Sequence, residues 1–276
     1  MARRETTSVA LRLTHVRLTF VPGLLVAILA TACGDTEERS VVPLSRPTGS
    51  DEVVVQVMVT GGFVPVGTAV SSVPTVTVLG DGTVITPAPV IAIYPGPAIT
   101  PLQSVRVPSG TVDDLVERAG DLVLLEGPLE LGQPPVADAP DTIVTITANG
   151  KEHRHVANAL GIGGRLDDAG PPMQISEQAA ANRRALRSFV DRTEALPPGE
   201  APWKPPAIAV YALGDYKPEP DLAQPERKWP LTTEPATQPT APGETIPCTV
   251  IDGGDVNVLL DCQRRPKIDP PAADEN

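Results

Sequence analysis

Apolar and polar residues alternate with the period of a β-strand along several short stretches of the chain. The clearest stretch is 52–60, EVVVQVMVT, in which one face carries Val53, Val55, Val57 and Val59. A period of two indicates a strand with one buried side. Further apolar stretches at 102–107, 207–213 and 248–251 also predict strands.

The stretch 74–86, PTVTVLGDGTVIT, predicts a hairpin. Its Asp81-Gly82 pair supplies the positive φ angles that a tight turn requires. With these two residues as the whole loop, Val76, Val78 and Ile85 are expected to share one face of the sheet.

Helices are predicted where apolar residues recur every three or four positions. In residues 111–119 these positions are Val112, Leu115, Val116 and Ala119. We expect Thr111 to cap this helix, with Asp114 three residues on as in a capping box, and Gly120 to end it.

Residues 176–196 predict a second helix. Its apolar stripe consists of Ala185, Leu186, Phe189 and Val190. Three arginines are expected to lie largely off that stripe: Arg183, Arg184 and Arg187. A third, short helix is expected to begin at Asp255.

A second hairpin is predicted over 141–156 around Asn149-Gly150, so that a hairpin is twice followed by a helix. The sequence therefore predicts an α+β fold, in which two or three helices pack on an antiparallel sheet built from hairpins. The segments VTVLGDGTVI and VTITANGKEH resemble each other weakly. Duplication is one interpretation of this likeness, and chance similarity between two hairpins is the favoured one.

The first 32 residues have the layout of a secretory signal. Arginine at positions 3, 4, 12 and 17 precedes an uncharged apolar run at 18–32. This run is short for a membrane span, which needs about 20 residues. Pro22 and Gly23 interrupt it further. A permanent N-terminal membrane helix is the less favoured alternative.

The segment Leu29-Ala30-Thr31-Ala32-Cys33-Gly34 resembles the lipobox of bacterial lipoproteins, with Ala30 as its one departure. The resemblance implies that Cys33 carries a diacylglyceryl thioether and becomes the new N-terminus. Acyl chains on one residue would anchor the protein to the membrane, because each buried CH₂ contributes about 0.8 kcal/mol. An ordinary secreted protein, cleaved near an incidental Cys33, is the alternative.

Removal of the signal lowers the formal net charge from −12 to −15, because four arginines and one glutamate are lost. A chain this acidic is a poor binder of nucleic acid or of an anionic membrane surface. The predicted organisation is a signal peptide at 1–32, a tether at 33–51, an α+β domain at 52–263 and a disordered tail at 264–276. Within the domain we expect a subdivision near 165–172 and a proline-rich segment at 197–247.

Two cysteines remain beyond Cys33, namely Cys248 and Cys262. Outside the cytoplasm they are expected to pair. Such a disulfide would close a loop of about 15 residues and contribute roughly 3 kcal/mol in the loop-entropy model. A reactive or metal-binding pair is the less favoured interpretation.

His153 and His155 are the candidate metal ligands, since His-x-His on a strand places both rings on one face. A two-residue loop at Asn149-Gly150 sets them opposite Ile146 and Val144, which cannot be ligands. A third ligand would have to come from elsewhere, such as Asp138 or Asp141. Two half-buried or surface histidines remain the favoured interpretation, so no metal is expected.

No sequence motif of a hydrolase, zinc peptidase or nucleotide-binding loop occurs. The run at 161–166 begins like a dinucleotide-binding loop but ends in Leu166 where glycine belongs, so no cofactor is expected. Hydrolysis would need a carboxylate pair. The candidates are Asp113-Asp114 with Glu117, Asp167-Asp168, and Asp252 with Asp255. The acids also have explanations without catalysis: the helix dipole favours acids at the start of a helix, and acids in loops are solvated.

Most of the mature chain resembles a family of uncharacterised lipoproteins of high-GC Gram-positive bacteria. The matching segments are VVVQV with GGFVPV, VTVLGDGTVI, IAIYPGPAITPLQ, ERAGDLVL, VADAPDTIVTITANGKEHRH, ANALG, RRALRSFVDR and WPL. The resemblance implies a lipid-anchored domain on the outer face of the cytoplasmic membrane, with no known activity or catalytic residues. A non-enzymatic interaction or accessory role is favoured. The alternatives are an extracytoplasmic hydrolase and a small-ligand-binding lipoprotein.

The lipid anchor predicts that Cys33→Ala moves the protein from the membrane to the soluble fraction, because the substituted residue has no thiol to accept the lipid. Fractionation followed by immunoblotting measures the shift. Cys248→Ala is the matched control and should stay with the membrane. Full membrane retention of the Cys33→Ala variant would contradict lipid anchoring.

Overall fold

The computed structural model describes residues 44–64, 71–92, 97, 99–160, 175–210, 228–235 and 248–264, the last four of these as backbone. Its main element is a sheet of seven strands. They are β1 (Val53–Gly61), β2 (Val76–Leu79), β3 (Thr83–Pro87), β4 (Leu102–Arg106), β5 (Pro140–Ala148), β6 (Lys151–Asn158) and β7 (Ala201–Trp203).

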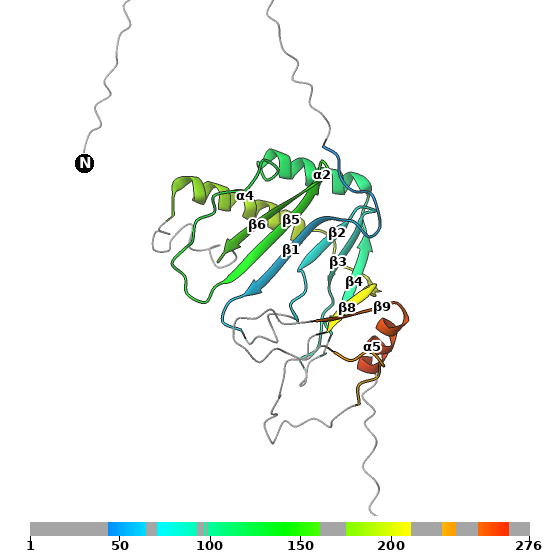
Figure 1. The fold of residues 1–276 in the computed structure, drawn as a ribbon. Helices are drawn as coiled ribbons and strands as arrows, with labels where there is room; N and C mark the ends of the chain where they lie inside the picture. The colour runs from blue at the N-terminus through cyan, green and yellow to red at the C-terminus, as the bar shows by residue number, and fades with distance from the viewer. Residues whose placement is uncertain are drawn as a thin grey trace, which may run out of the picture. The chain divides into compact units, whose positions relative to one another are not determined.

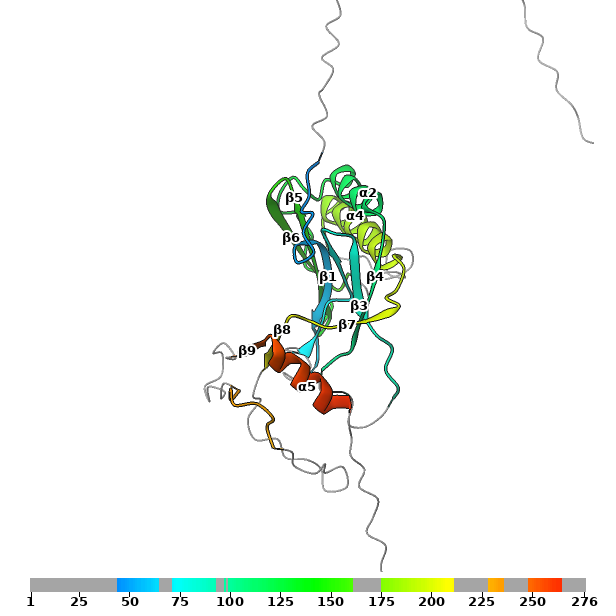
Figure 2. The same cartoon turned by 90° about the vertical axis from the view of Figure 1, so that its right-hand side faces the viewer.

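The strand order is β6-β5-β1-β2-β3-β4-β7, and each of these pairings is antiparallel (Figure 1). Two helices, α2 (Ser109–Asp121) and α4 (Glu177–Glu194), follow the two hairpins. In the side view they lie together on one side of the sheet (Figure 2). The predicted α+β class is therefore confirmed.

The core lies between these two helices and one face of the sheet. Valines dominate the sheet side, and each strand near the centre contributes some of them. The largest fully buried side chains include Phe189, Leu186, Leu124 and Ile146. The predicted stripe of α2 is buried as well, at Val112, Leu115, Val116 and Ala119. Full burial of one such Val, Leu or Phe side chain contributes about 1.5–3 kcal/mol.

Strand β1 is more deeply buried than alternation predicts. Val55 and Val57 face the core as expected, but Val54 is also fully buried. The pairing of β1 with β2 shifts between Val53 and Val55, which is a β-bulge. At the far end of the strand, Val59 is 38% exposed. The strand therefore begins buried on both sides and ends half-exposed.

The β2–β3 hairpin differs from the prediction by one residue. Thr77 pairs with Ile85 and Val78 with Val84, so the loop consists of three residues, 80–82. A slip of one residue moves every side chain of a strand to the other face. Val84 therefore joins Val78 on the core face, and the predicted place of Ile85 on that face was wrong.

Contacts around Asp81 and Gly82 explain the longer loop. Gly82 has a positive φ of 88°, whereas Asp81 does not have a positive φ. One residue of positive φ at the end of the loop is typical of a three-residue hairpin. The Asp81 carboxylate accepts the amide N–H of Thr83 at 2.9 Å and pairs with Arg106 at 2.5 Å. Partial burial raises the pKa of Asp81, but these contacts with Thr83 and Arg106 outweigh it, so the pKa is lowered overall.

The β5–β6 hairpin forms as predicted. Asn149 and Gly150 both have positive φ, 53° and 69°, as a two-residue loop requires. Ile146 pairs with His153 and Val144 with His155. The turn and the register of this hairpin are therefore confirmed, whereas its two histidines are buried and not half-buried or at the surface as expected.

Helix α2 does not begin as predicted. Its N-cap is Pro108, with no side-chain cap, and Thr111 lies inside the helix. Gly120 is also inside, because the helix continues to Asp121 and its C-cap is Leu122. The capping box and the glycine stop were therefore wrong. By contrast, α4 begins with Ser176 accepting the amide N–H of Ala179 at 3.0 Å.

Arg183 is buried, contrary to the expectation that it lies off the apolar stripe of α4. Its side chain is among the buried charged residues, with 5% exposed. The guanidinium donates to the carbonyl oxygens of Asn158 at 2.7 Å and Leu131 at 3.2 Å. A long arginine can be buried in this way because its five N–H groups find backbone acceptors.

A smaller unit consists of strands β8 (Ala207–Val210) and β9 (Thr249–Asp252) and helix α5 (Gly254–Arg264). Its core contains Ile251, Val256 and Leu259, with Trp229 packed against it. Trp229 therefore holds part of the proline-rich segment to a core. Within that segment residues 211–227 and 236–247 lie outside the described residues, as do 161–174 and 265–276 elsewhere in the chain.

The hairpin geometry predicts unequal effects of two glycine substitutions. An added methyl at Gly82 would collide with the carbonyl oxygen of Val107, whereas nothing lies within 4 Å of one at Gly150. Gly82→Ala should lower the free energy of unfolding by about 2–4 kcal/mol, from backbone strain and a clash. Gly150→Ala should cost about 1 kcal/mol from strain alone. Urea denaturation measures both losses, and equal losses would contradict the close approach of Val107 to Gly82.

Candidate functional site

The two candidate metal ligands lie inside the core. His153 and His155 sit on the core face of β6 with 7% and 2% of their surface exposed. The ring Nε2 of His155 lies 2.8 Å from the carbonyl oxygen of Leu124. Because a carbonyl only accepts, this nitrogen must carry the proton. The other ring nitrogen of His155, Nδ1, is buried without a hydrogen-bond partner in the described part of the chain.

This contact holds the turn that ends α2. Val123, next to Leu124, has φ 63°, which is rare for a β-branched residue and indicates strain. Leu124 is fully buried and its carbonyl is bound to His155. The burial of Leu124 and the bond from His155 together stabilise the strained turn, which gives His155 a structural role.

In the part of the chain that the structure describes, no third metal ligand joins the two histidines. Asp141 pairs with Asn158 in the sheet and accepts its side-chain amide at 3.0 Å. Side chains alternate between the two faces along β5, so Asp141 lies on the same face as Ile143. Val144, which pairs with His155, lies on the other face together with the histidines. Among the described residues no group of three or more His, Cys, Asp or Glu is placed to hold a metal. Asp141 is therefore excluded as the third ligand.

Burial lowers the pKa of His153 below its ordinary value of 6.5, and the charges of Lys151 and His155 lower it further. Burial disfavours the charged imidazolium, and positive neighbours add repulsion. His153 is thus held neutral over a wider pH range than a free histidine.

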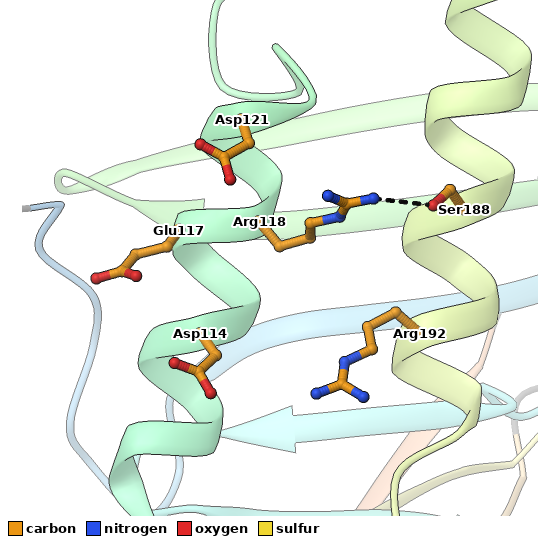
Figure 3. A pocket seen from close by; sticks show the side chains of 6 residues that line it. All are labelled: Asp114, Glu117, Arg118, Asp121, Ser188 and Arg192. Carbon is orange, nitrogen blue, oxygen red and sulfur yellow. Dashed lines mark hydrogen bonds between the residues drawn. The ribbon is translucent and has the colours of Figure 1, made fainter.

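A shallow groove between α2 and α4 is the hollow that carries ionisable side chains (Figure 3). Its volume is about 440 Å³, and it lies on the outer side of the helix layer. It is lined by Asp114, Glu117, Arg118, Asp121, Ser188 and Arg192. The helical spacing of α2 explains its wall, since positions three, four and seven apart share one side of a helix.

The two walls of the groove differ in charge. All three carboxylates come from α2, whereas α4 contributes Ser188 and Arg192. Arg118 reaches from α2 across the groove and donates to the Ser188 hydroxyl at 3.2 Å (Figure 3). Arg192 extends toward α2 and forms no ion pair with any described residue. The groove therefore offers free carboxylates and a free guanidinium side by side.

The sequence identified part of this groove. Asp114 and Glu117 were candidate carboxylates, but Asp113 points elsewhere and pairs with Arg46 at 2.6 Å. The partners on α4 were missed, because a helix sequence does not reveal which second helix lies beside it. Asp252 is exposed, Asp255 lies in the first turn of α5, and Asp167-Asp168 lie outside the described residues.

The cysteine predictions are largely untested. Cys33 lies outside the described residues, and so does the side chain of Cys262. Cys248 is exposed and forms no disulfide with any side chain that the structure describes. The disulfide and the lipid anchor stay predictions. In the described part of the chain, no helix is long and apolar enough to cross a membrane.

No protein-family model matches this sequence, and comparison with curated proteins and with solved structures also gives no match.

The lowered pKa of His153 predicts a loss of stability in acid. Below pH 6.5 the unfolded chain binds a proton at this residue more readily than the folded chain, so folding is penalised progressively as the pH falls toward the folded pKa. His153→Gln removes that penalty. The urea concentration at the unfolding midpoint is measured between about pH 7.5 and about pH 5. As the pH falls, this midpoint should decrease less steeply for His153→Gln than for the parent protein. Parallel curves for the two proteins would contradict the shift.

Proposed function

We propose that this protein is a lipid-anchored domain on the outer face of the cytoplasmic membrane, which acts by binding a partner and not by catalysis. The observation that carries the binding role is the groove between α2 and α4, with its free Arg192 opposite the carboxylates of α2. The anchor rests on the sequence of residues 1–34 and on the resemblance to lipoproteins.

The groove suits recognition better than hydrolysis. A glycoside hydrolase needs two carboxyl groups that flank the bond to be broken. Here the carboxylates line one wall, and the facing wall supplies a hydroxyl and a guanidinium. Charged, solvent-open walls are typical of a surface that steers and orients a partner.

The chemistry of the groove indicates what the partner carries. Free carboxylates on α2 would pair with lysine or arginine, and Arg192 would pair with a carboxylate. The partner is therefore expected to be a protein or peptide segment with both charges close together. A purely anionic polymer would be repelled by the three acids and by the net charge of the chain, which falls from −12 to −15 when the signal is removed.

A charge reversal in the groove tests this proposal. The full-length protein, Arg192→Glu and Arg184→Glu are cross-linked on the membrane and captured, and partners are quantified by mass spectrometry. Arg184 is the matched control, because it is an exposed arginine of α4 that does not line the groove. Arg192→Glu should lower partner recovery about tenfold, since a like-charge contact costs more than ~1.4 kcal/mol.

The outcomes separate the proposal from its alternatives. Recovery of no reproducible partner by the parent protein would count against an interaction role and favour a hydrolase or a ligand carrier. Equal recovery by both variants would leave an interaction role but remove the groove as its surface.

A further inference from the structure

Residues 44–51, the last part of the predicted tether, are bound to the domain along helix α2. We call these residues the strap. Within it Arg46 is the residue held most firmly, with only 8% of its side chain exposed although it carries a charge. A charged side chain is buried to this extent only when hydrogen-bond acceptors surround it.

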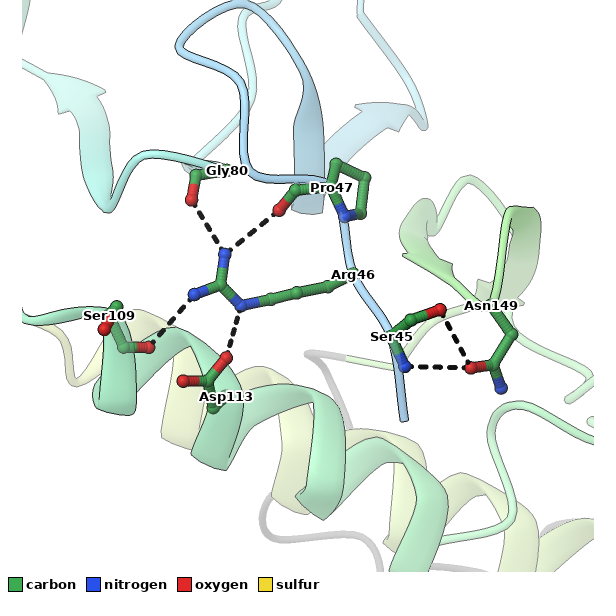
Figure 4. A network of polar contacts seen from close by, with 7 residues as sticks. All are labelled: Ser45, Arg46, Pro47, Gly80, Ser109, Asp113 and Asn149. Carbon is green, nitrogen blue, oxygen red and sulfur yellow. Dashed lines mark hydrogen bonds and ion pairs between the residues drawn. The ribbon is translucent and has the colours of Figure 1, made fainter. Parts of the chain in front are cut away.

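Arg46 has such acceptors on three sides (Figure 4). Its Nε pairs with the Asp113 carboxylate at 2.6 Å. One terminal nitrogen donates to the carbonyl oxygens of Gly80 at 2.7 Å and Pro47 at 3.0 Å, and the other to that of Ser109 at 3.3 Å. The guanidinium thus joins the strap to the first turns of α2 and to the β2–β3 loop. A lysine could not span these positions, because it lacks the planar fork of donors.

The residues on either side of Arg46 are also bound. The Ser45 amide and hydroxyl donate to the Asn149 side-chain oxygen at 2.9 Å and 3.3 Å (Figure 4). The Asn149 backbone amide donates to the Ser45 carbonyl at 2.7 Å. Further along, the backbone of residues 48–49 lies so close to Gly80 that an added methyl there would be 2.7 Å from it. The strap is therefore fixed to two separate β-turns.

Contacts of the strap reach both ends of α2. Arg46 binds Ser109 and Asp113 near the start of the helix. The side chain of Leu44 lies over Gly120 in the last turn, where an added methyl would be 2.9 Å from it. A neighbouring side of α2 forms the acidic wall of the groove, since Asp114 and Glu117 follow Asp113 within one turn. The strap thus packs against the helix that carries four of the groove's ionisable groups.

We propose that the strap couples the N-terminal anchor to the groove: it fixes the point at which the chain leaves the domain and holds α2 in place. The coupling to a membrane rests on the proposed lipid anchor, whereas the seating of α2 does not. With the strap bound, the tether left between Cys33 and Leu44 is ten residues and spans at most about 36 Å. With the strap released, eighteen residues would span up to about 65 Å.

Hydrogen exchange followed by mass spectrometry tests the strap on the full-length protein. The lipidated protein in vesicles and the Cys33→Ala protein in solution are compared with Arg46→Ala in each background. In the parent, residues 44–52 should exchange slowly in both backgrounds. Arg46→Ala should speed exchange about tenfold in 44–52 and in the α2 segment 109–121, while the β5 segment 142–146 stays protected.

A pair of glycine substitutions gives a second route that leaves Arg46 intact. Gly80→Ala should release the strap by displacing residues 48–49. Gly110→Ala is the matched control, because its added methyl meets nothing within 4 Å. Gly80→Ala should therefore reproduce the exchange pattern of Arg46→Ala, and Gly110→Ala should not.

Each contrary outcome has one meaning. Fast exchange of 44–52 in the parent, or unchanged exchange of 109–121 in Arg46→Ala, would overturn the proposal. Equal loss of protection in 142–146 would also overturn it, by making Arg46 a general stability residue. If residues 44–52 are protected in solution but the Cys33→Ala protein stays on the membrane, the proposed lipid anchor is contradicted. The proposal that the strap holds α2 in place is then unaffected.

Discussion

Packing of two helices against the valine-rich face of the sheet is the interaction on which the rest of this structure depends. Aromatic residues make up only 3% of the chain, so branched aliphatic side chains must fill the core. Phe189 is the one aromatic side chain among the largest fully buried residues. Val and Ile are stiff at χ1 and pack well on a pleated surface. A sheet rich in these residues can therefore pack against helices without large aromatic side chains in the core.

That packing also determines where polar groups lie. His153 and His155 face the helices because β6 alternates and β5 fixes its register. They are consequently buried, and one of them stabilises the turn after α2. The same layer brings α2 and α4 close enough to form the groove, with acids on one wall and Arg192 on the other. Beside the N-terminal turns of α2, Arg46 is buried among carbonyl oxygens and one carboxylate.

Where local chemistry was sufficient, prediction succeeded. The Asn149-Gly150 turn was correct because both residues tolerate positive φ and a two-residue loop leaves no freedom of register. The burial of Val112, Leu115, Val116 and Ala119 followed from helical spacing. The Asp81-Gly82 turn failed because only Gly82 has positive φ, and Arg106 and Thr83 hold Asp81 in a longer loop. Thr111 was a plausible cap, but Pro108 starts the helix earlier.

By itself the sequence determined the α+β class, the strand and helix stripes and one complete hairpin, because periodicity and turn dihedrals depend on residues a few positions apart. The tertiary structure decided the burial of Arg46 and Arg183, the register of β3 and the pairing of α2 with α4. These features depend on contacts between distant residues: Ser45 and Asn149 are 104 positions apart, and Arg46 and Asp113 are 67 apart. A charged residue in a polar segment is predicted to be exposed to solvent, because the sequence does not show the hydrogen-bond acceptors that the folded chain places around it. Only the folded chain could therefore show that part of the predicted tether is bound to the domain.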